Sequence, residues 1–400
     1  MRPNIESVRS VLSHTVDAID QEHLMRSLGG TKRLRIKLGC DPTSPDLHLG
    51  HAVVLRELKK LQAIGHTIIF IIGDFTAMIG DPSGRSAVRK PLTPADIKKN
   101  AKTYFQQVGK ILDLKKVEVR HNSSWLSRTT WDRVLELNAQ FTSSRILERD
   151  DFQKRLRQGA EVWMHELQYP LLQGYDSVMV RADIEVGGTD QLFNLMVGRH
   201  LMERLHLKPQ NVMTFPILPG LDGTEKMSKS LGNYVGLMEV PREMFGKLMS
   251  IPDESISIYF RLTTERSDRD IQEIEARLKR GENPRDIKLE LAREVTAIYH
   301  GGETAERARM EFIRVFSNKE APQDLETVTL PAGSYEAAAV ILTLKLTKSR
   351  SEAFRLVTQG ALEITPPDAA KFRPGDPREL IRLSSGTVIR LGKTRFIKIA

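Results

Sequence analysis

One stretch, residues 34–74, constrains the fold more than any other part of the chain. Residues 34–40 alternate basic and apolar side chains as a short strand does, and residues 67–73 are almost entirely apolar, which is typical of a buried strand. Between them, apolar residues recur at helical spacing until Gly65, a residue type that commonly ends a helix. Strand, loop, helix and strand in this order predict a βαβ unit and therefore a parallel sheet.

The loop of this unit carries residues suited to holding an anion. It reads Asp41-Pro-Thr-Ser-Pro-Asp-Leu-His48-Leu-Gly-His51 and leads directly into the helix. Backbone N–H groups and the helix dipole favour a phosphate at such a helix N-terminus, and both histidines can reach the same anion. Two histidines around a glycine also occur by chance, so the interpretation needs a second motif.

The second motif is the stretch Gly223-Thr-Glu-Lys226-Met227-Ser228-Lys229-Ser230-Leu-Gly-Asn233. Two lysines stand three residues apart in a run of small and polar residues that cannot form a core. Such a run suits a flexible loop that closes over a polyphosphate.

Three further segments predict ligand-facing positions. The Gly/Asp-rich turn that includes Asp81 follows the second predicted strand, and residues 182–191 read as a strand, a glycine turn and a helix that begins near Asp190. In open α/β sheets, ligands bind at the carboxyl ends of the strands. Tyr169, Gln173 and Asp176 share one face if their segment is helical, although Pro170 can kink or start that helix.

Composition narrows the class of protein. A formal charge of +9 favours a polyanionic partner, and nucleic acid is the leading candidate. Cys40 is the only cysteine, which excludes an intrachain disulfide and a cysteine-cluster metal site. The N-terminus lacks an apolar signal core and no apolar run is long enough to span a bilayer, so we expect a cytoplasmic protein with no membrane partner.

Changes in composition along the chain predict three domains. Residues 1–235 hold the strand and glycine-turn patterns, interrupted at about 92–163 by a polar, helical insertion. The pattern of the insertion favours a packing role over a site of its own. Residues 236–332 read as charged amphipathic helices followed by a linker. Residues 333–400 carry twelve Lys/Arg against six Asp/Glu, net +6, and end in alternating basic and apolar residues.

The motifs HLGH, GDPSGR, YPLLQGYD, GGTDQ and KMSKS, in that order, resemble those of class I aminoacyl-tRNA synthetases, and of the bacterial tyrosyl-tRNA synthetases in particular. Residues 333–400 resemble the small RNA-binding domain shared with ribosomal protein S-four. The resemblance implies an α/β protein. Its Rossmann-like catalytic domain with a helical insertion would be followed by an α-helical anticodon-binding domain and a small α+β RNA-binding domain.

The resemblance also implies a two-step reaction. The carboxylate of L-tyrosine attacks the α-phosphate of ATP, which arrives with Mg²⁺ and without a dedicated protein metal site. The tyrosyl-adenylate is then attacked by a ribose hydroxyl of the terminal adenosine of tRNA(Tyr). By analogy with the family, we expect a homodimer whose inserted segment forms the contact.

The family's ATP-binding residues map onto this chain position by position. Thr43 and His48 would hold the pyrophosphate end, Gly50 would let adenosine approach, and His51 would lie near its ribose. Asp190 would accept from ribose hydroxyls. The complete set implied for ATP is Asp41, Thr43, His48, Gly50, His51, Gly188, Asp190, Lys226, Met227, Ser228 and Lys229. Catalytic roles fall to Thr43, His48, His51, Arg85, Arg89, Lys226 and Lys229, the two arginines binding pyrophosphate and the two lysines closing over it.

The residues implied for tyrosine lie mainly on the predicted helical stripe. Asp81, Tyr169 and Gln173 would hold the ammonium group, Asp176 would accept from the phenol hydroxyl, and Gln191 would contact the carboxylate. Lys37 departs from the pattern of the best-known branch of the family, which has a tyrosine there. We expect Lys37 either to donate to the phenol oxygen or to pair with Asp176.

Two alternatives remain open at this point. One is another enzyme with the HxGH motif, either a tryptophan ligase or a nucleotidyltransferase that makes a small dinucleotide; the lysine loop, Asp176 and the basic C-terminal segment argue against it. The other is a non-enzymatic RNA-binding protein, against which the intact histidines and lysines argue. Each site residue also has a structural explanation by itself, as a turn former, a core residue or a solvated helix face.

Overall fold

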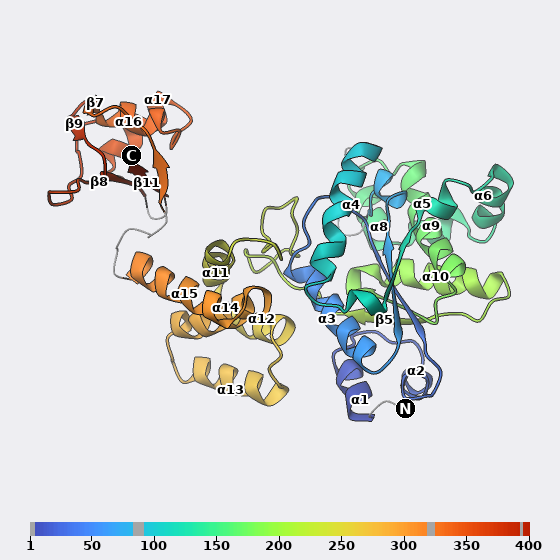
Figure 1. Cartoon of the computed structure of the whole chain (residues 1–400). Helices are drawn as coiled ribbons and strands as arrows, with labels where there is room; N and C mark the ends of the chain where they lie inside the picture. The colour runs from blue at the N-terminus through green and yellow to red at the C-terminus, as the bar shows by residue number, and fades with distance from the viewer. Residues whose placement is uncertain (1–4, 83–91, 318–324, 393–394) are drawn as a thin grey trace. The chain divides into compact units, whose positions relative to one another are not determined.

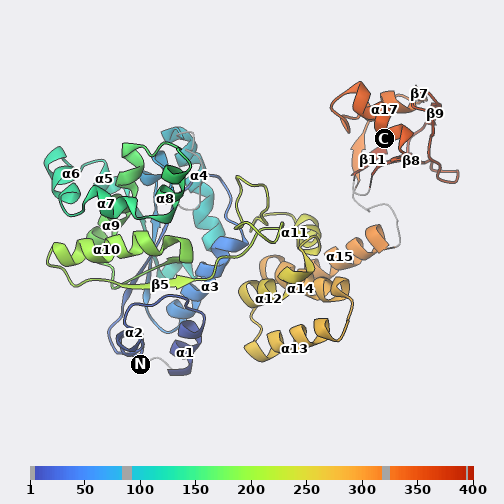
Figure 2. The ribbon, with the colours of Figure 1, turned by 180° about the vertical axis from the view of Figure 1, so that it is seen from behind.

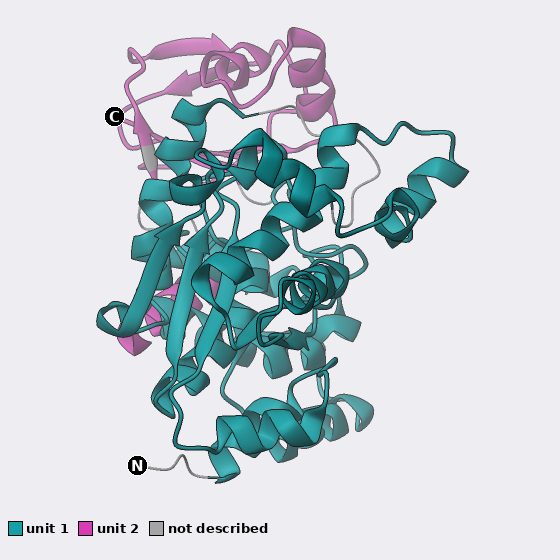
Figure 3. Ribbon diagram, turned by 90° about the vertical axis from the view of Figure 1, so that its right-hand side faces the viewer, with its two compact units in different colours: residues 1–300 teal, residues 301–400 magenta. Residues whose placement is uncertain are grey.

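The computed structural model describes residues 5–82, 92–317, 325–392 and 395–400 (Figure 1). The chain folds into two compact units, residues 1–300 and residues 301–400, which Figure 3 distinguishes by colour. Among the described helices, none has the length and apolar character that a membrane span requires. The two units are described separately below.

A five-stranded parallel sheet forms the centre of the first unit. Its strand order is β3-β2-β1-β4-β5. The strands are β1 (Arg35–Cys40), β2 (Thr67–Ile72), β3 (Val117–His121), β4 (Ile184–Gly188) and β5 (Asn211–Phe215). Strand β1 pairs with β2 from Arg35 opposite Thr67, and with β4 from Ile36 opposite Ile184. The order reverses direction at β1, so the crevice between the carboxyl ends of β1 and β4 is the switch point where such sheets bind ligands.

Helices cover this sheet and connect its strands. They are α1 (Ile5–Ser13), α2 (Gln21–Leu28), α3 (Leu49–Ala63), α4 (Pro94–Val108), α9 (Met164–Val180) and α10 (Leu192–Arg204). Helix α3 connects β1 to β2, so the predicted βαβ unit is confirmed. Strand β2 is buried along almost its whole length, which explains its unbroken apolar sequence. The predicted α/β, Rossmann-like fold class is confirmed.

The segment predicted to be a helical insertion is not wholly helical. It contains α4, α5 (Ser123–Leu126), α6 (Trp131–Asn138), α7 (Ser143–Leu147) and α8 (Asp150–Arg157), but also β3, an outer strand of the main sheet. Strand β3 reads Val-Glu-Val-Arg-His and is only partly buried, because it pairs on one side only. A strand at a sheet edge therefore looks polar in the sequence, which is why the pattern did not reveal it.

Over residues 241–300 the first unit consists of helices joined by short connections. The α-helices are α11 (Pro241–Met249), α12 (Ile256–Thr263), α13 (Asp268–Lys279) and α14 (Pro284–His300). These helices lie in the segment predicted to form amphipathic helices, and a proline occupies the first position of α14, where its missing N–H costs no hydrogen bond.

The second unit has its own core. It begins with α15 (Gly302–Phe312) and a π-helical turn (Ile313–Ser317). Its strands are β6 (Glu326–Val328), β7 (Gly333–Glu336), β8 (Leu362–Thr365), β9 (Leu380–Leu383), β10 (Val388–Leu391) and β11 (Arg395–Ile399), in sheets ordered β6-β11-β10-β8 and β7-β9. Helices α16 (Ala337–Thr343) and α17 (Arg350–Thr358) pack on them. The small α+β C-terminal fold predicted from the resemblance is confirmed.

Helices α9 and α10 lie side by side in both Figure 1 and Figure 2, and glycines allow their close approach. A Cβ atom on Gly174 of α9 would lie 3.1 Å from the Cα atom of Gly198 on α10. A Cβ atom on Gly198 would lie 2.8 Å from the Gln210 side chain. The backbones of the two helices meet at these positions, and no larger residue fits without displacing one of them.

We therefore expect Gly174→Val to destabilise the first unit by about 1–3 kcal/mol through overpacking. Gly246→Ala is the matched control, because a Cβ atom on Gly246, within α11, meets nothing within 4 Å. Urea unfolding followed by tryptophan fluorescence measures the effect in the first unit alone, since all three tryptophans lie there. Equal stability of Gly174→Val and the wild type would contradict the close approach.

Candidate active site

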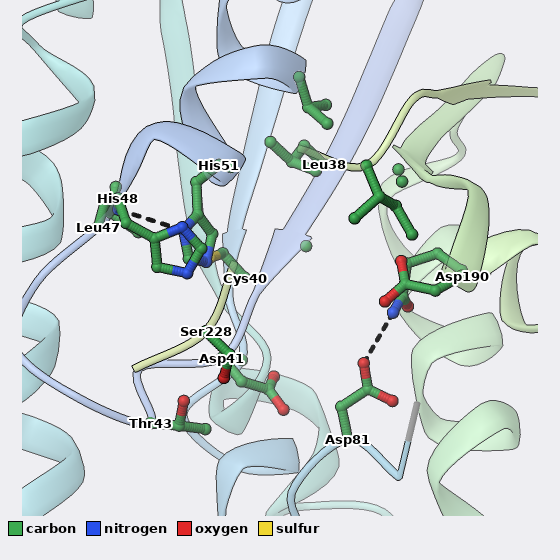
Figure 4. Close-up of a pocket in the computed structure, with 18 of the residues that line it drawn as sticks. Leu38, Cys40, Asp41, Thr43, Leu47, His48, His51, Asp81, Asp190 and Ser228 are labelled. Atoms are coloured by element: carbon green, nitrogen blue, oxygen red, sulfur yellow. Dashed lines mark hydrogen bonds between the residues drawn. The ribbon is translucent and has the colours of Figure 1, made fainter. Parts of the chain in front are cut away.

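A cavity of about 1040 Å³ opens at the carboxyl ends of β1, β2 and β4. Figure 4 shows His48 and His51 on one side of it and Asp81 and Asp190 on the other. The sequence-predicted residues that line it are Asp41, Thr43, His48, Gly50, His51, Asp81, Tyr169, Gln173, Asp176, Gly188, Asp190, Gln191, Lys226, Met227, Ser228 and Lys229. Lys37 is not among the lining residues, and Arg85 and Arg89 lie outside the described residues.

Backbone pairing brings the two distant motifs to the same place. The N–H of Leu49 donates to the carbonyl of Val235 at 3.0 Å, and the N–H of Leu237 donates to the carbonyl of Leu47 at 2.9 Å. The histidine loop is thereby fixed to the segment that directly follows the lysine loop. One ligand in the cavity can therefore contact both motifs at once.

Helix α4 holds the histidine loop from the other side. The Asn100 amide donates to the carbonyl of Pro42 at 3.0 Å, and the Gln107 amide donates to the carbonyl of Pro45 at 2.8 Å. The N–H of Leu47 donates to Gln107 Oε1 at 2.6 Å. Two buried amides thus satisfy loop groups that have no regular secondary structure to pair with. The sequence did not predict the roles of Asn100 and Gln107, because a polar residue on an amphipathic helix is normally assigned to the face exposed to solvent.

The two histidines are uncharged at neutral pH. Burial lowers the pKa of His51 to about 3, with a smaller contribution from Lys229, and burial also lowers the pKa of His48 well below its usual value. The N–H of His48 donates to His51 Nδ1 at 3.3 Å, so the proton of the neutral His51 ring sits on Nε2. His48 Nδ1 is buried and has no hydrogen-bond partner among the described residues. Both rings can bond to an anion or hydroxyl without adding charge.

Gly50 is required by the packing of this loop. A Cβ atom there would lie 3.0 Å from the ring of His48 and 3.7 Å from Met227 Cβ. The glycine lets the histidine ring and the lysine loop approach the start of α3 closely.

The lysine loop is held over the cavity by polar contacts. Lys226 Nζ lies 2.7 Å from Asp190 Oδ2, while Lys229 donates to the Ser44 hydroxyl. Buried Asn233 shapes the loop from within: its Oδ1 accepts from the N–H of Ser228 at 2.8 Å, and its Nδ2 donates to the carbonyl of Lys226 at 3.2 Å. Lys226 is thereby directed toward the Asp190 turn, and Lys229 toward the histidine loop.

Three residues gather at the end of β1 around Asp41. Tyr169 Oη donates to Asp41 Oδ2 at 3.0 Å, and the Thr76 hydroxyl donates to Oδ1 at 2.7 Å. Burial raises the pKa of Asp41 to about 7, although both hydrogen bonds oppose the shift. A Cβ atom on Gly73 would lie 2.0 Å from Asp41 Oδ1, so only glycine fits there. Asp41, predicted for ATP, therefore lies beside Tyr169, predicted for the ammonium group of tyrosine.

Asp176 is held by two residues of the segment predicted to be an insertion. Trp125 Nε1 donates to Asp176 Oδ1 at 2.8 Å, and Asn122 Nδ2 donates to Oδ2 at 3.2 Å. Burial raises the pKa of Asp176 to about 6, while the charge of Lys37 and these two donors act in the opposite direction. Tyr169, Gln173 and Asp176 all line the cavity from α9, which contains Pro170, so the predicted helical stripe is confirmed.

Lys37 points into the protein interior. Its ammonium donates to the carbonyl of Gln173 at 2.8 Å, to Ser177 Oγ at 2.7 Å and to Glu185 Oε1 at 2.8 Å. Lys37 and Glu185 are 0% and 1% exposed, so this is a fully buried ion pair. An ammonium has three protons, and these three acceptors match them. The lysine fixes α9 to β1 and β4, and its charge acts on Asp176 through space.

The arrangement supplies cations and neutral donors at one end of the cavity and carboxylates at the other, of which Asp176 is buried. The cationic end suits a polyphosphate, while Asp41, Asp81 and Asp176 suit a smaller ligand with an ammonium group and a hydroxyl. Within the described residues, no group of three or more His, Cys, Asp or Glu side chains is arranged to hold a metal ion. The geometry therefore fits the activation of a carboxylate by a nucleotide.

Comparison with known proteins agrees with this geometry. Residues 30–317 match the family model described as tRNA synthetases class I (W and Y). A tyrosine–tRNA ligase of Thermotoga maritima is 46% identical over 398 residues, covering 99% of this chain and 97% of that protein. One of Oleidesulfovibrio alaskensis is 47% identical over 398 residues, covering 98% of each chain.

Solved structures show the same fold. The tyrosyl-tRNA synthetase of Archaeoglobus fulgidus, solved with L-tyrosine, has a TM-score of 0.61 and 23% identity, covering 76% of this chain and 100% of that one. A C-terminally truncated mitochondrial tyrosyl-tRNA synthetase of Aspergillus nidulans has a TM-score of 0.63 and 22% identity, covering 79% and 95%. The resemblance predicted from the motifs is confirmed: this chain belongs to the class I tRNA synthetase family, in its group of tyrosine–tRNA ligases.

Proposed function

We propose that this enzyme activates L-tyrosine with ATP in the cavity between the two motifs and then transfers the tyrosyl group to the terminal adenosine of tRNA(Tyr). The observation that carries the proposal is the joining of three groups in one cavity: the neutral histidines, the two loop lysines and the Asp176 pocket of α9. Class I synthetases use ATP as a substrate, and a cavity of about 1040 Å³ can hold a nucleotide beside an amino acid.

In the first step, the tyrosine carboxylate attacks the α-phosphate and pyrophosphate leaves. Negative charge then grows on the phosphoryl oxygens and on the leaving group. Lys226 and Lys229 neutralise the charge of pyrophosphate, while Thr43 and the neutral imidazole of His48 donate to its oxygens. We assign Arg85 and Arg89 to the same leaving group by their motif.

The nucleoside end of ATP is bound between the histidine loop and the turn that follows β4. Gly50 and Gly188 allow close approach of the backbone, and His51 and Asp190 bond to ribose hydroxyls. Lys226 Nζ donates to Asp190 Oδ2 at 2.7 Å, so the residue assigned to the ribose lies directly beside a lysine assigned to the leaving group. A magnesium ion carried by the ATP phosphates would supply further charge neutralisation.

Selectivity for tyrosine follows from Asp176. A phenol hydroxyl donates to this carboxylate, whose two oxygens are already oriented by Trp125 and Asn122. Phenylalanine would bury the same carboxylate without its donor, which is the costly mismatch that gives a polar pocket its discrimination. Asp81, Tyr169 and Gln173 would hold the ammonium group, and Gln191 the carboxylate.

The remaining parts of the chain are assigned to RNA and to assembly. We divide the chain into a catalytic segment (1–235, with the insertion at about 92–163), a helical anticodon-binding segment with its linker (236–332) and an RNA-binding segment (333–400). Strand β6 of the linker pairs with β11 and so belongs structurally to the last segment. The net charge of +6 on the last segment and its capped basic helix α17 suit a phosphate backbone. We place the enzyme in the cytoplasm.

We also propose a homodimer formed through the insertion. Large apolar side chains are exposed there: Trp131 is 76% exposed, Leu135 is 60% exposed, and Met164, just beyond the insertion, is 73% exposed. Apolar groups of this size gathered on one segment are typical of an interface.

Pyrophosphate exchange into ATP, with each of the twenty amino acids supplied separately and no tRNA, tests the function. We expect exchange with tyrosine alone. Exchange with tryptophan would overturn the assignment of Asp176, and exchange with no amino acid would favour an RNA-binding protein without this activity.

We expect Asp176→Ala to weaken tyrosine binding by about 10- to 100-fold, the cost of losing a hydrogen bond to a charged group at about 1.5–3 kcal/mol. Titration calorimetry without ATP measures this directly. Phenylalanine is the internal control: the variant no longer has the carboxylate that phenylalanine leaves without a donor, so the affinity for phenylalanine should rise rather than fall. Unchanged tyrosine affinity would refute the role of Asp176.

Lys226→Ala and Lys229→Ala should each slow adenylate formation by roughly 10²- to 10³-fold while tyrosine affinity persists, because each lysine acts on charge that develops in the transition state. Single-turnover kinetics of adenylate formation measure the rate. Lys279→Ala, an exposed lysine at the end of α13, is the matched control. An equal loss of tyrosine affinity in the loop variants would indicate a structural role instead.

A further inference from the structure

A buried asparagine that does not line the cavity bonds to two residues that do. Asn194 of α10 is 0% exposed. Its Nδ2 donates to Gln173 Oε1 and to Gln191 Oε1, both at 3.1 Å. Its Oδ1 accepts from Arg149 Nη1 at 3.0 Å. Asn194 thus connects the two glutamines assigned to tyrosine with a buried guanidinium.

The groups at the ends of this network fix the orientation of every amide within it. Gln173 Nε2 lies 3.2 Å from Glu185 Oε1, and Gln191 Nε2 lies 2.8 Å from Asp81 Oδ2. Carboxylates accept only, so each glutamine must turn its nitrogen toward its acidic partner and its oxygen toward Asn194. Arg149 has donors only, so Asn194 must turn its oxygen toward Arg149 and its nitrogen toward the glutamines.

Both acidic partners are themselves held by cations. Glu185 pairs with Lys37 at 2.8 Å, and Asp81 pairs with Arg149 at 3.3 Å. Arg149 is buried and precedes α8, so it reaches the site from the insertion. These pairs keep the carboxylates as acceptors, and reversal of any one amide would set two acceptors or two donors face to face.

We propose that Asn194 is a positioning residue that sets the polarity of the Gln173 and Gln191 amides toward bound tyrosine. The inference rests on the proposed function. An amide presents either its N–H donor or its oxygen acceptor to a ligand, according to which way it is turned. A ligand ammonium needs the oxygen, whereas a ligand carboxylate needs the N–H. Because Asn194 has no contact with the cavity, it acts only through the two glutamines.

Two variants separate this role from simple packing. Asn194→Asp keeps the size of the side chain but removes its donor. Each glutamine oxygen then faces the new carboxylate. If the glutamine amide turns over, its oxygen faces Glu185 or Asp81 instead, so neither orientation is satisfied. Asn194→Ala leaves space and removes the partner without adding repulsion. A packing role predicts greater harm from alanine, through the cavity it leaves. The polarity role predicts greater harm from aspartate.

The experiment is titration calorimetry of the full chain with L-tyrosine, without ATP. We expect Asn194→Ala to weaken binding roughly fivefold to tenfold, and Asn194→Asp to weaken it about 10²-fold through misplaced contact groups. Asn211→Asp is the matched control, since Asn211 is a buried asparagine of β5 outside the network and its change should leave tyrosine affinity unaltered. The KM for ATP in pyrophosphate exchange should stay unchanged in all variants.

Tyrosine binding by Asn194→Asp that equals or exceeds that of Asn194→Ala would overturn the inference alone. A wild-type chain that binds no tyrosine would overturn the proposed function with it. Should Asn194→Asp not fold, as shown by circular dichroism, Asn194→Ser decides the question. Its hydroxyl retains one donor, so we expect tighter tyrosine binding than with Asn194→Ala, and equal affinities of these two would contradict the proposal.

Discussion

The site depends on a short backbone pairing between Leu47–Leu49 and Val235–Leu237. These hydrogen bonds join a loop at the end of β1 to a segment almost two hundred positions later in the printed sequence. Together with the contact of Lys229 with Ser44, they fix the lysine loop beside the histidines, so that the cations face the part of the cavity that the histidine loop lines. Because main-chain groups make the contact, its geometry does not depend on the side chains of the pairing residues.

Burial disfavours the charged form of a side chain, and this shifts the pKa values of the histidines and of the carboxylates in opposite directions at the two ends of the cavity. The histidines are buried beside lysines, so their pKa values fall and they remain neutral donors. At the other end, burial raises the pKa values of Asp41 and Asp176, and hydrogen bonds from neighbouring side chains oppose the shift. A low-dielectric site strengthens every such contact, which favours discrimination between ligands that differ by one hydroxyl. The same burial makes each unpaired polar atom costly.

Much of the fold and of the candidate site could be predicted from residue patterns. The βαβ unit, the polar stripe of α9 and the loop lysines each have a local periodicity or composition that limits what they can form. The supporting residues were not predictable in this way. Trp125 and Asn122 lie in a segment that reads as a packing insertion, and β3 reads as polar because it is an edge strand. For Lys37, sequence reasoning expected a contact with the phenol or with Asp176, whereas the side chain forms a buried pair with Glu185.

By itself, the sequence determined the class of fold, the motifs and the chemistry they can support, because periodicity, helix ends and loop composition are properties of neighbouring residues. Tertiary structure alone decided which polar groups share a cavity and which way each buried amide turns. Those features depend on donors and acceptors that meet from separate elements, as Asn194 of α10 meets Gln173 of α9. No local pattern encodes them, since an asparagine in a helix has the same sequence signature whether it is solvated or holds a network together.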